Sequence, residues 1–98
     1  DMTTTEILKE YPLQVDARTL RALLNDVNRE MAIYSNLVTQ FEKQQGCDLK
    51  TFESRIKQKE LPEHPTWETF IEWGTAADEL EKSTLIQKAL SWILNFLN

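Results

Sequence analysis

The strongest constraint on the fold is a heptad repeat of apolar residues within residues 20–41. Its members are separated by alternating steps of four and three residues, and they are Leu20, Leu24, Val27, Met31, Tyr34, Val38 and Phe41. This spacing places all of these side chains along one face of a long α-helix. Such a stripe must be covered, either by another part of the chain or by a second chain. We call these residues the seam.

Composition favours a single helical domain spanning residues 1–98. The 98 residues include only two glycines and three prolines, which is few for a turn-rich β fold. Hydrophobic residues make up 41% and charged residues 28%, so the chain is expected to fold rather than stay disordered. A core of this size is thin, and small domains often gain the missing burial by forming oligomers.

Capping residues delimit the expected helices. Asp16 can cap a helix over residues 17–45, which would be about 40 Å long and would end at Gly46. Asp48 can cap a second helix over residues 49–59. Because a helix of this length exceeds the core of an ordinary small domain, we expect a hairpin of long helices or a coiled-coil pairing.

The segments on either side are shorter. A threonine within residues 3–5 can cap a short N-terminal helix over residues 3–10, which Pro12 would end. Residues 61–65 contain two prolines and form the clearest linker. Thr66 can cap the helix that follows.

The last third of the chain carries two apolar sets that do not line up on a straight helix. The first set is Phe70, Trp73, Ala77 and Leu80, and the second is Leu85, Ile86, Ala89, Leu90, Ile93 and Leu97. At 100° per residue, the second set points well away from the first. We favour a helix break at residues 82–84 with Ser83 as a new cap. The alternative is one continuous helix that buries two faces against different neighbours.

Together these features predict an all-α fold: a long, coiled-coil-like helical hairpin with a short connecting helix and an apolar C-terminal helix. The C-terminal helix is apolar nearly all round, because Trp92, Leu94 and Phe96 widen its stripe. It must therefore be buried within the fold, in a dimer or in a partner.

Charge is distributed unevenly. The net charge is −5, and residues 60–81 carry seven acids and no base: Glu60, Glu63, Glu68, Glu72, Asp78, Glu79 and Glu81. This segment repels phosphate and attracts basic partners, although an acidic stretch can also be a solvated helix face. The charges of Arg18, Arg21 and Arg29 are neutralised by three nearby acids, so direct nucleic-acid binding is not favoured; the acids are Asp16, Asp26 and Glu30.

Residues suited to catalysis or metal binding are scarce. His64 is the only histidine and Cys47 the only cysteine, and no paired ligand spacing surrounds them. The two glycines are isolated, so no phosphate-binding loop is present. We therefore expect a protein that is not an enzyme and that has no cofactor or metal.

The single cysteine rules out a disulfide within the chain and suits a reducing compartment. The N-terminus has no basic-then-apolar signal segment, and the apolar run 85–97 is about half a membrane span. We expect a cytoplasmic protein with no membrane partner.

From residue 41 onward the chain resembles a group of small helical prokaryotic proteins, many of which are antitoxin-like proteins encoded beside a small toxin. The resembling segments are Phe-Glu-Lys-Gln-Gln-Gly-Cys-Asp-Leu at 41–49, Thr-Phe-Glu-Ser-Arg at 51–55, the linker 61–65, and Trp-Glu with Ile-Glu-Trp in 67–73. The group more often has Lys-Tyr where this chain has Gln44 and Gln45, and the chain lacks an obvious N-terminal DNA-binding module. The resemblance covers about residues 30–82 and implies partner binding rather than catalysis.

These considerations lead to one functional expectation, a non-catalytic helical interaction module that inhibits a small, basic toxin. The expected partner-binding residues are Trp67, Glu68, Ile71, Glu72 and Trp73, with the acids steering encounter and the tryptophans anchoring contact. We also expect a homo-oligomer, with a dimer favoured, formed through the seam, the C-terminal helix or both. The alternatives are a self-associating structural scaffold and a DNA-associated regulator.

Overall fold

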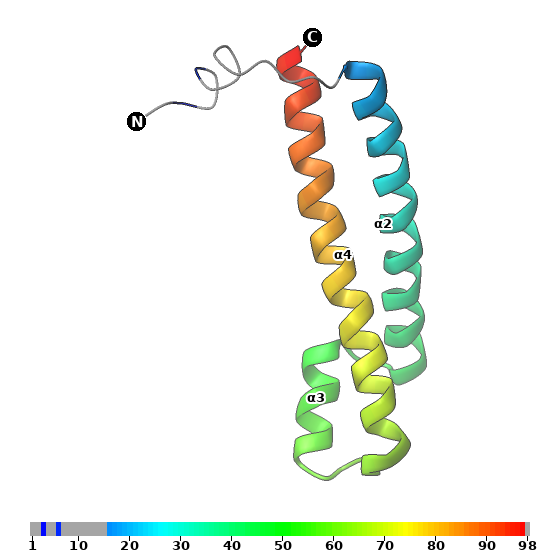
Figure 1. Cartoon of the computed structure of the whole chain (residues 1–98). Helices are drawn as coiled ribbons and strands as arrows, with labels where there is room; N and C mark the ends of the chain where they lie inside the picture. The colour runs from blue at the N-terminus through cyan, green and yellow to red at the C-terminus, as the bar shows by residue number, and fades with distance from the viewer. Residues whose placement is uncertain (1–2, 4–5, 7–15, 98) are drawn as a thin grey trace.

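The computed structural model describes Thr3, Glu6 and residues 16–97, and within these residues the fold is all-α. The elements are α2 (Ala17–Gln45), α3 (Leu49–Lys57) and α4 (Glu63–Leu97). The long helices α2 and α4 form an antiparallel hairpin, and α3 lies beside α4 near the connection (Figure 1). We call this the closed end, and we call the other end, where α2 begins and α4 ends, the open end.

The limits of α2 agree with the prediction. The Asp16 side chain accepts a hydrogen bond from the backbone N–H of Thr19 at 2.8 Å, which satisfies a free donor of the first turn. At the other end Gly46 has a φ of 69°, and its N–H donates to the carbonyl of Glu42 at 2.8 Å. This left-handed position suits glycine, which has no Cβ.

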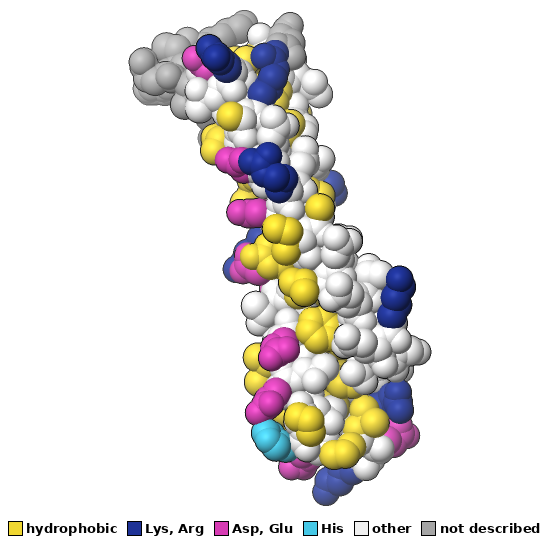
Figure 2. Space-filling model, turned by 90° about the vertical axis from the view of Figure 1, so that its right-hand side faces the viewer, with side chains coloured by type: hydrophobic (Ala, Val, Ile, Leu, Met, Phe, Trp, Pro, Cys, Tyr) yellow, Lys and Arg dark blue, Asp and Glu magenta, His cyan; other side chains and the backbone are white. Residues whose placement is uncertain are grey.

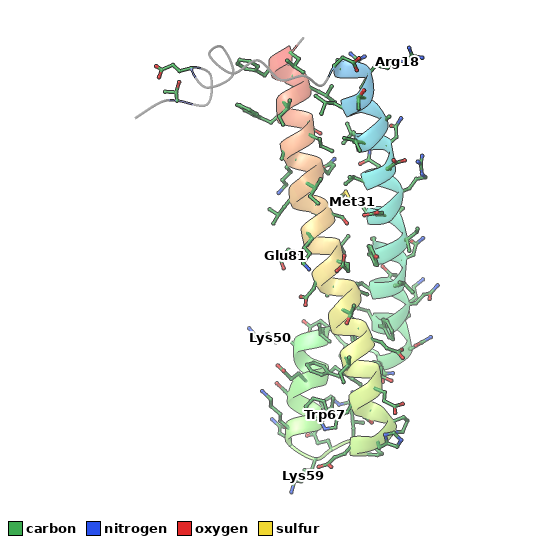
Figure 3. All side chains as sticks on the ribbon, in the orientation of Figure 1. Arg18, Met31, Lys50, Lys59, Trp67 and Glu81 are labelled. Atoms are coloured by element: carbon green, nitrogen blue, oxygen red, sulfur yellow. The ribbon has the colours of Figure 1, made fainter. Side chains whose placement is uncertain are left out.

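The seam faces α4 along the length of the hairpin. Leu20 is buried, the other six seam residues are half-buried, and most other side chains of α2 are exposed. Met31, near the middle of the seam, points from α2 toward α4 (Figure 3). The seam is therefore covered within the chain, and in this fold it is not free to pair with a second copy.

The connecting helix α3 is shorter than expected, because it ends at Lys57 rather than residue 59. Asp48 caps it by accepting from the N–H of Thr51 at 2.8 Å. After Gln58 the chain turns through Lys59, whose φ of 59° is left-handed and cannot continue a helix. Phe52 is the most deeply buried side chain of α3.

The last helix is continuous from Pro65 to its end, and the break expected at residues 82–84 is wrong. His64 has a non-helical backbone, so the regular helix starts just after it. Ser83 is 3% exposed and lies in the packed interior rather than at a cap. The Thr84 hydroxyl donates to the carbonyl of Leu80 at 2.8 Å, so this polar side chain is satisfied without ending the helix.

The face that α4 turns toward α2 has its own heptad spacing. Its members are Trp73, Ala76, Leu80, Ser83, Gln87, Leu90 and Leu94, and all of them are buried or half-buried. We call this set the inner stripe. Because Ser83 and Gln87 interrupt its apolar character, a search for apolar residues alone does not reveal it.

The core of the closed end is built around Trp73, which is 1% exposed. Its ring stacks on Phe41 of α2 at 5.7 Å and lies 5.3 Å from Phe52 of α3. One aromatic side chain from each helix therefore meets at a single point. Ile56 is buried in the same cluster.

The short N-terminal helix expected over residues 3–10 falls mostly outside the described residues. The two described positions form a reciprocal pair, because the N–H of Thr3 donates to the Glu6 carboxylate and the N–H of Glu6 donates to the Thr3 hydroxyl, both at 3.2 Å. This exchange is the arrangement of a capping box and supports Thr3 as the capping residue.

Replacing Trp73 should test the core directly. We expect Trp73→Ala to lower the free energy of unfolding by about 3–5 kcal/mol, because it empties a site shared by three helices. Trp67→Ala, at a residue 40% exposed, should cost less than about 1 kcal/mol. Urea unfolding followed by circular dichroism measures both, and equal losses would contradict this assignment. If Trp73→Ala does not fold, Phe52→Leu should still show a loss of about 1 kcal/mol.

The capping aspartates should contribute to the pH dependence of stability. Hydrogen bonds from Thr19 and Thr51 lower the pKa of Asp16 and the pKa of Asp48 below the ordinary 3.8. The contribution of the two ionised carboxylates to the stability of the fold is therefore complete above pH 3.8, and it is lost as the pH falls through their lowered pKa values. Asp16→Asn with Asp48→Asn keeps both caps but removes the titration. Urea midpoints between about pH 5 and pH 2 should fall less in this variant than in the original chain.

Candidate protein-interaction surface

The side of α4 that points away from α2 carries a second heptad series. Its members are Ile71, Thr75, Asp78, Lys82, Leu85, Ala89, Trp92 and Phe96, and all of them are exposed. At 100° per residue this series lies roughly opposite the inner stripe. We call it the outer stripe. It is apolar at both ends and polar in the middle.

At the closed end, Trp67 extends the apolar part of this surface. Trp67 is 40% exposed, and its ring contacts Phe70 edge-to-face at 5.4 Å. Phe70 in turn packs against the core cluster around Trp73. The exposed tryptophan is thus held in place by a side chain that is itself anchored, which lowers the entropy lost when a partner binds. Figure 3 shows Trp67 on α4 at the closed end.

Ile71 lies one turn further along α4 and is 62% exposed, the highest value among the exposed large hydrophobic side chains of the described residues. Glu68 and Glu72 occupy the neighbouring positions and are also exposed. The Glu68 carboxylate lies 3.5 Å from Nδ1 of His64, and both groups are open to solvent. The two apolar side chains and the two carboxylates are therefore exposed on adjoining faces of the same two turns of α4.

Trp73 does not share this surface. The sequence prediction grouped it with Trp67 as a partner-binding residue, but its 1% exposure places it in the core. The four other predicted partner-binding residues are exposed on α4. The difference arises because Trp67 and Trp73 are six residues apart, or about 120° apart when viewed down the helix.

The open end of the outer stripe was not identified as a separate surface from the sequence. Leu85 is 60% exposed, Ile86 50% and Trp92 48%. The rings of Trp92 and Phe96 stack at 5.9 Å, with an interplanar angle of 20°. The signal that could have revealed this surface is the alternation of four and three residues from Leu85 to Phe96, which lies roughly opposite the inner stripe on the helix.

On α2 the exposed hydrophobic side chains are more scattered. Leu23, Ile33 and Leu37 are exposed; Leu23 and Leu37 lie on the flank of the seam, and Ile33 lies further round the helix. Figure 2 shows the α2 side of the hairpin, where hydrophobic side chains form a broken line with charged groups beside it. Isolated apolar residues of this kind are normal on a protein surface.

A groove of about 400 Å³ lies between α2 and α4 near the open end. Its lining residues are Arg21, Leu24, Asn25, Ser91, Leu94 and Asn95. This lining contains one charged side chain, no histidine and no carboxylate, so it offers no pair of groups for acid–base chemistry. Its shallow form also differs from the enclosed pockets that bind small molecules.

Within Thr3, Glu6 and residues 16–97, no group of three or more potential ligands is placed to hold a metal ion. A search of the same residues for a helix long and apolar enough to cross a membrane finds none. Cys47 is a free thiol that packs, half-buried, against the core cluster.

Comparison with known proteins gives no further guidance, because no protein-family model, no curated protein and no solved structure matches the chain.

Proposed function

We propose that the chain is a non-catalytic helical interaction module that binds and inhibits a small, basic protein, in the manner of an antitoxin. The observation that carries this proposal is the exposed pair Trp67 and Ile71 on one face of α4, with the exposed Glu68 and Glu72 on the adjoining face. Anchored aromatic side chains are typical of binding hot spots, and adjacent carboxylates favour a basic partner.

Charge distribution supports a basic partner at the closed end. Residues 38–81, which form this half of the hairpin, contain ten acids and five bases, a net charge of −5. The remaining described residues of the hairpin, 16–37 and 82–97, contain three acids and five bases, a net charge of +2. A basic protein is thus attracted to the half that carries Trp67 and Ile71.

The first experiment is a comparative affinity capture from the native source. Tagged original chain and a Trp67→Ala/Ile71→Ala variant are used as baits, followed by mass spectrometry and mass determination of the eluted complexes. We expect one small, basic protein in stoichiometric amount with the original chain and its loss with the variant. A partner retained equally by both baits would contradict binding at this surface.

Once a partner is identified, charge reversal tests the role of the acids. Glu68→Lys with Glu72→Lys should slow association about tenfold or more at low ionic strength and weaken its salt dependence. The matched control is Asp26→Lys with Glu30→Lys, which makes the same change in net charge on α2, away from the closed end. Stopped-flow measurements of both variants decide the question, because equal slowing would show that only net charge matters.

A self-associating scaffold is the second candidate function. The specific observation in its favour is the apolar open end of the outer stripe, which no other described residue of the chain (Thr3, Glu6 and 16–97) buries. The two candidates differ in the capture experiment, because a scaffold would be recovered as a defined homo-oligomer without a basic protein.

A further inference from the structure

We infer that the open end of the outer stripe is an interface with a second copy of this chain, in which the two α4 helices pack antiparallel about a twofold axis. The surface consists of the exposed residues Leu85, Ile86, Ala89, Trp92, Phe96 and Leu97. This inference goes beyond the basic partner proposed above and does not depend on it.

The size of the surface is the first argument. From the exposed fractions of its side chains, the patch presents roughly 500 Å² of apolar area. A specific interface buries about 800 Å² on each partner, of which the polar rim supplies part. The backbone of the hairpin also extends only 17 Å in its shortest dimension, so the two long helices form a single layer.

Self-complementarity is the second argument. In a twofold antiparallel pair, the residue numbers of two contacting residues add up to the same value for every contact. Each contact is repeated, with the two chains exchanged, on the other side of the axis. One register places the large Trp92 against the small Ala89 of the second copy, and Leu85 against its Phe96. Ile86 and Ile93 then flank the same contact. This register therefore pairs a large side chain with a small one on each side of the axis.

Charge is the third argument, and it selects a second copy in antiparallel orientation. Within residues 85–97 the only charged side chain is Lys88, which lies to one side of the outer stripe. Overlap of the open ends places the two acidic closed halves at opposite ends of the dimer. A parallel pair would bring two halves of net charge −5 side by side and would be opposed by their repulsion.

The arrangement also predicts a shape. The hairpin is 57 Å long, and the two α4 helices overlap over about 13 residues, or roughly 20 Å. The dimer should therefore measure about 95 Å from end to end. It leaves both copies of the closed end exposed, with Trp67 and Ile71 free on each.

The test uses the full chain and begins with sedimentation equilibrium and small-angle scattering. We expect a dimer about 95 Å long. Leu85→Glu or Phe96→Lys should raise its dissociation constant at least tenfold, because a twofold interface contains each substituted residue twice and so buries two added charges. Ile33→Glu is the matched control, since Ile33 is 58% exposed on α2. Ile71→Glu provides a second control at the closed end of the outer stripe. Circular dichroism should show that all four variants keep their helices.

A mixing experiment tests the register itself. Neither Leu85→Glu nor Phe96→Lys should form a homodimer, but a mixture of the two variants should form a heterodimer. In the mixture, the glutamate introduced at position 85 of one chain meets the lysine introduced at position 96 of the other, and this ion pair replaces one apolar contact. The original contact between Leu85 and Phe96 remains on the other side of the axis.

Four results would overturn the inference. They are a monomer at all concentrations, a dimer that survives Leu85→Glu, a dimer no longer than one hairpin, and dissociation caused by Ile71→Glu.

Discussion

The structure depends on the packing of two heptad stripes against each other. The seam of α2 and the inner stripe of α4 bury each other along the hairpin, and Trp73 sets their relative position at the closed end. Its ring lies on Phe41 and beside Phe52, so a shift of either long helix would break an aromatic contact with the other or with α3. At the open end Leu20 and Leu94 are both buried, which shows that the same pairing continues along the hairpin.

The double use of α4 follows from this arrangement. A helix with one apolar face has no apolar surface left once that face is covered. In contrast, α4 has apolar residues on two nearly opposite faces. The inner stripe includes Ser83 and Gln87, while Leu85 and Trp92 are directed outward. The chain thus buries some polar side chains and exposes large apolar ones, which is expected where a protein keeps a surface for association.

The two ends of the outer stripe differ in their chemistry. The closed end combines Trp67 and Ile71 with carboxylates, whereas the open end combines Leu85, Trp92 and Phe96 with almost no charge. This difference is the reason for assigning a basic partner to the first and a second copy to the second. A charged surface selects its partners by electrostatic complementarity, and an uncharged apolar surface selects them by shape complementarity.

Much of the fold could be predicted from the sequence, because local chemistry determines it. The seam spacing, the caps at Asp16 and Asp48 and the glycine at position 46 depend on neighbours within a few residues, and the structure confirms each of them. Of the five residues expected to bind a partner, four are exposed and Trp73 is buried, and their role in binding stays a prediction. Tertiary structure decided the rest. Trp67 and Trp73 lie about 120° apart on α4, and the packing of α2 and α3 determines that the direction of Trp73 is the buried one. Ser83 was expected to cap a new helix, because a serine can begin a helix as well as pack within one. Here α2 covers it, and burial against a second helix is a property that residues 82–84 do not carry by themselves.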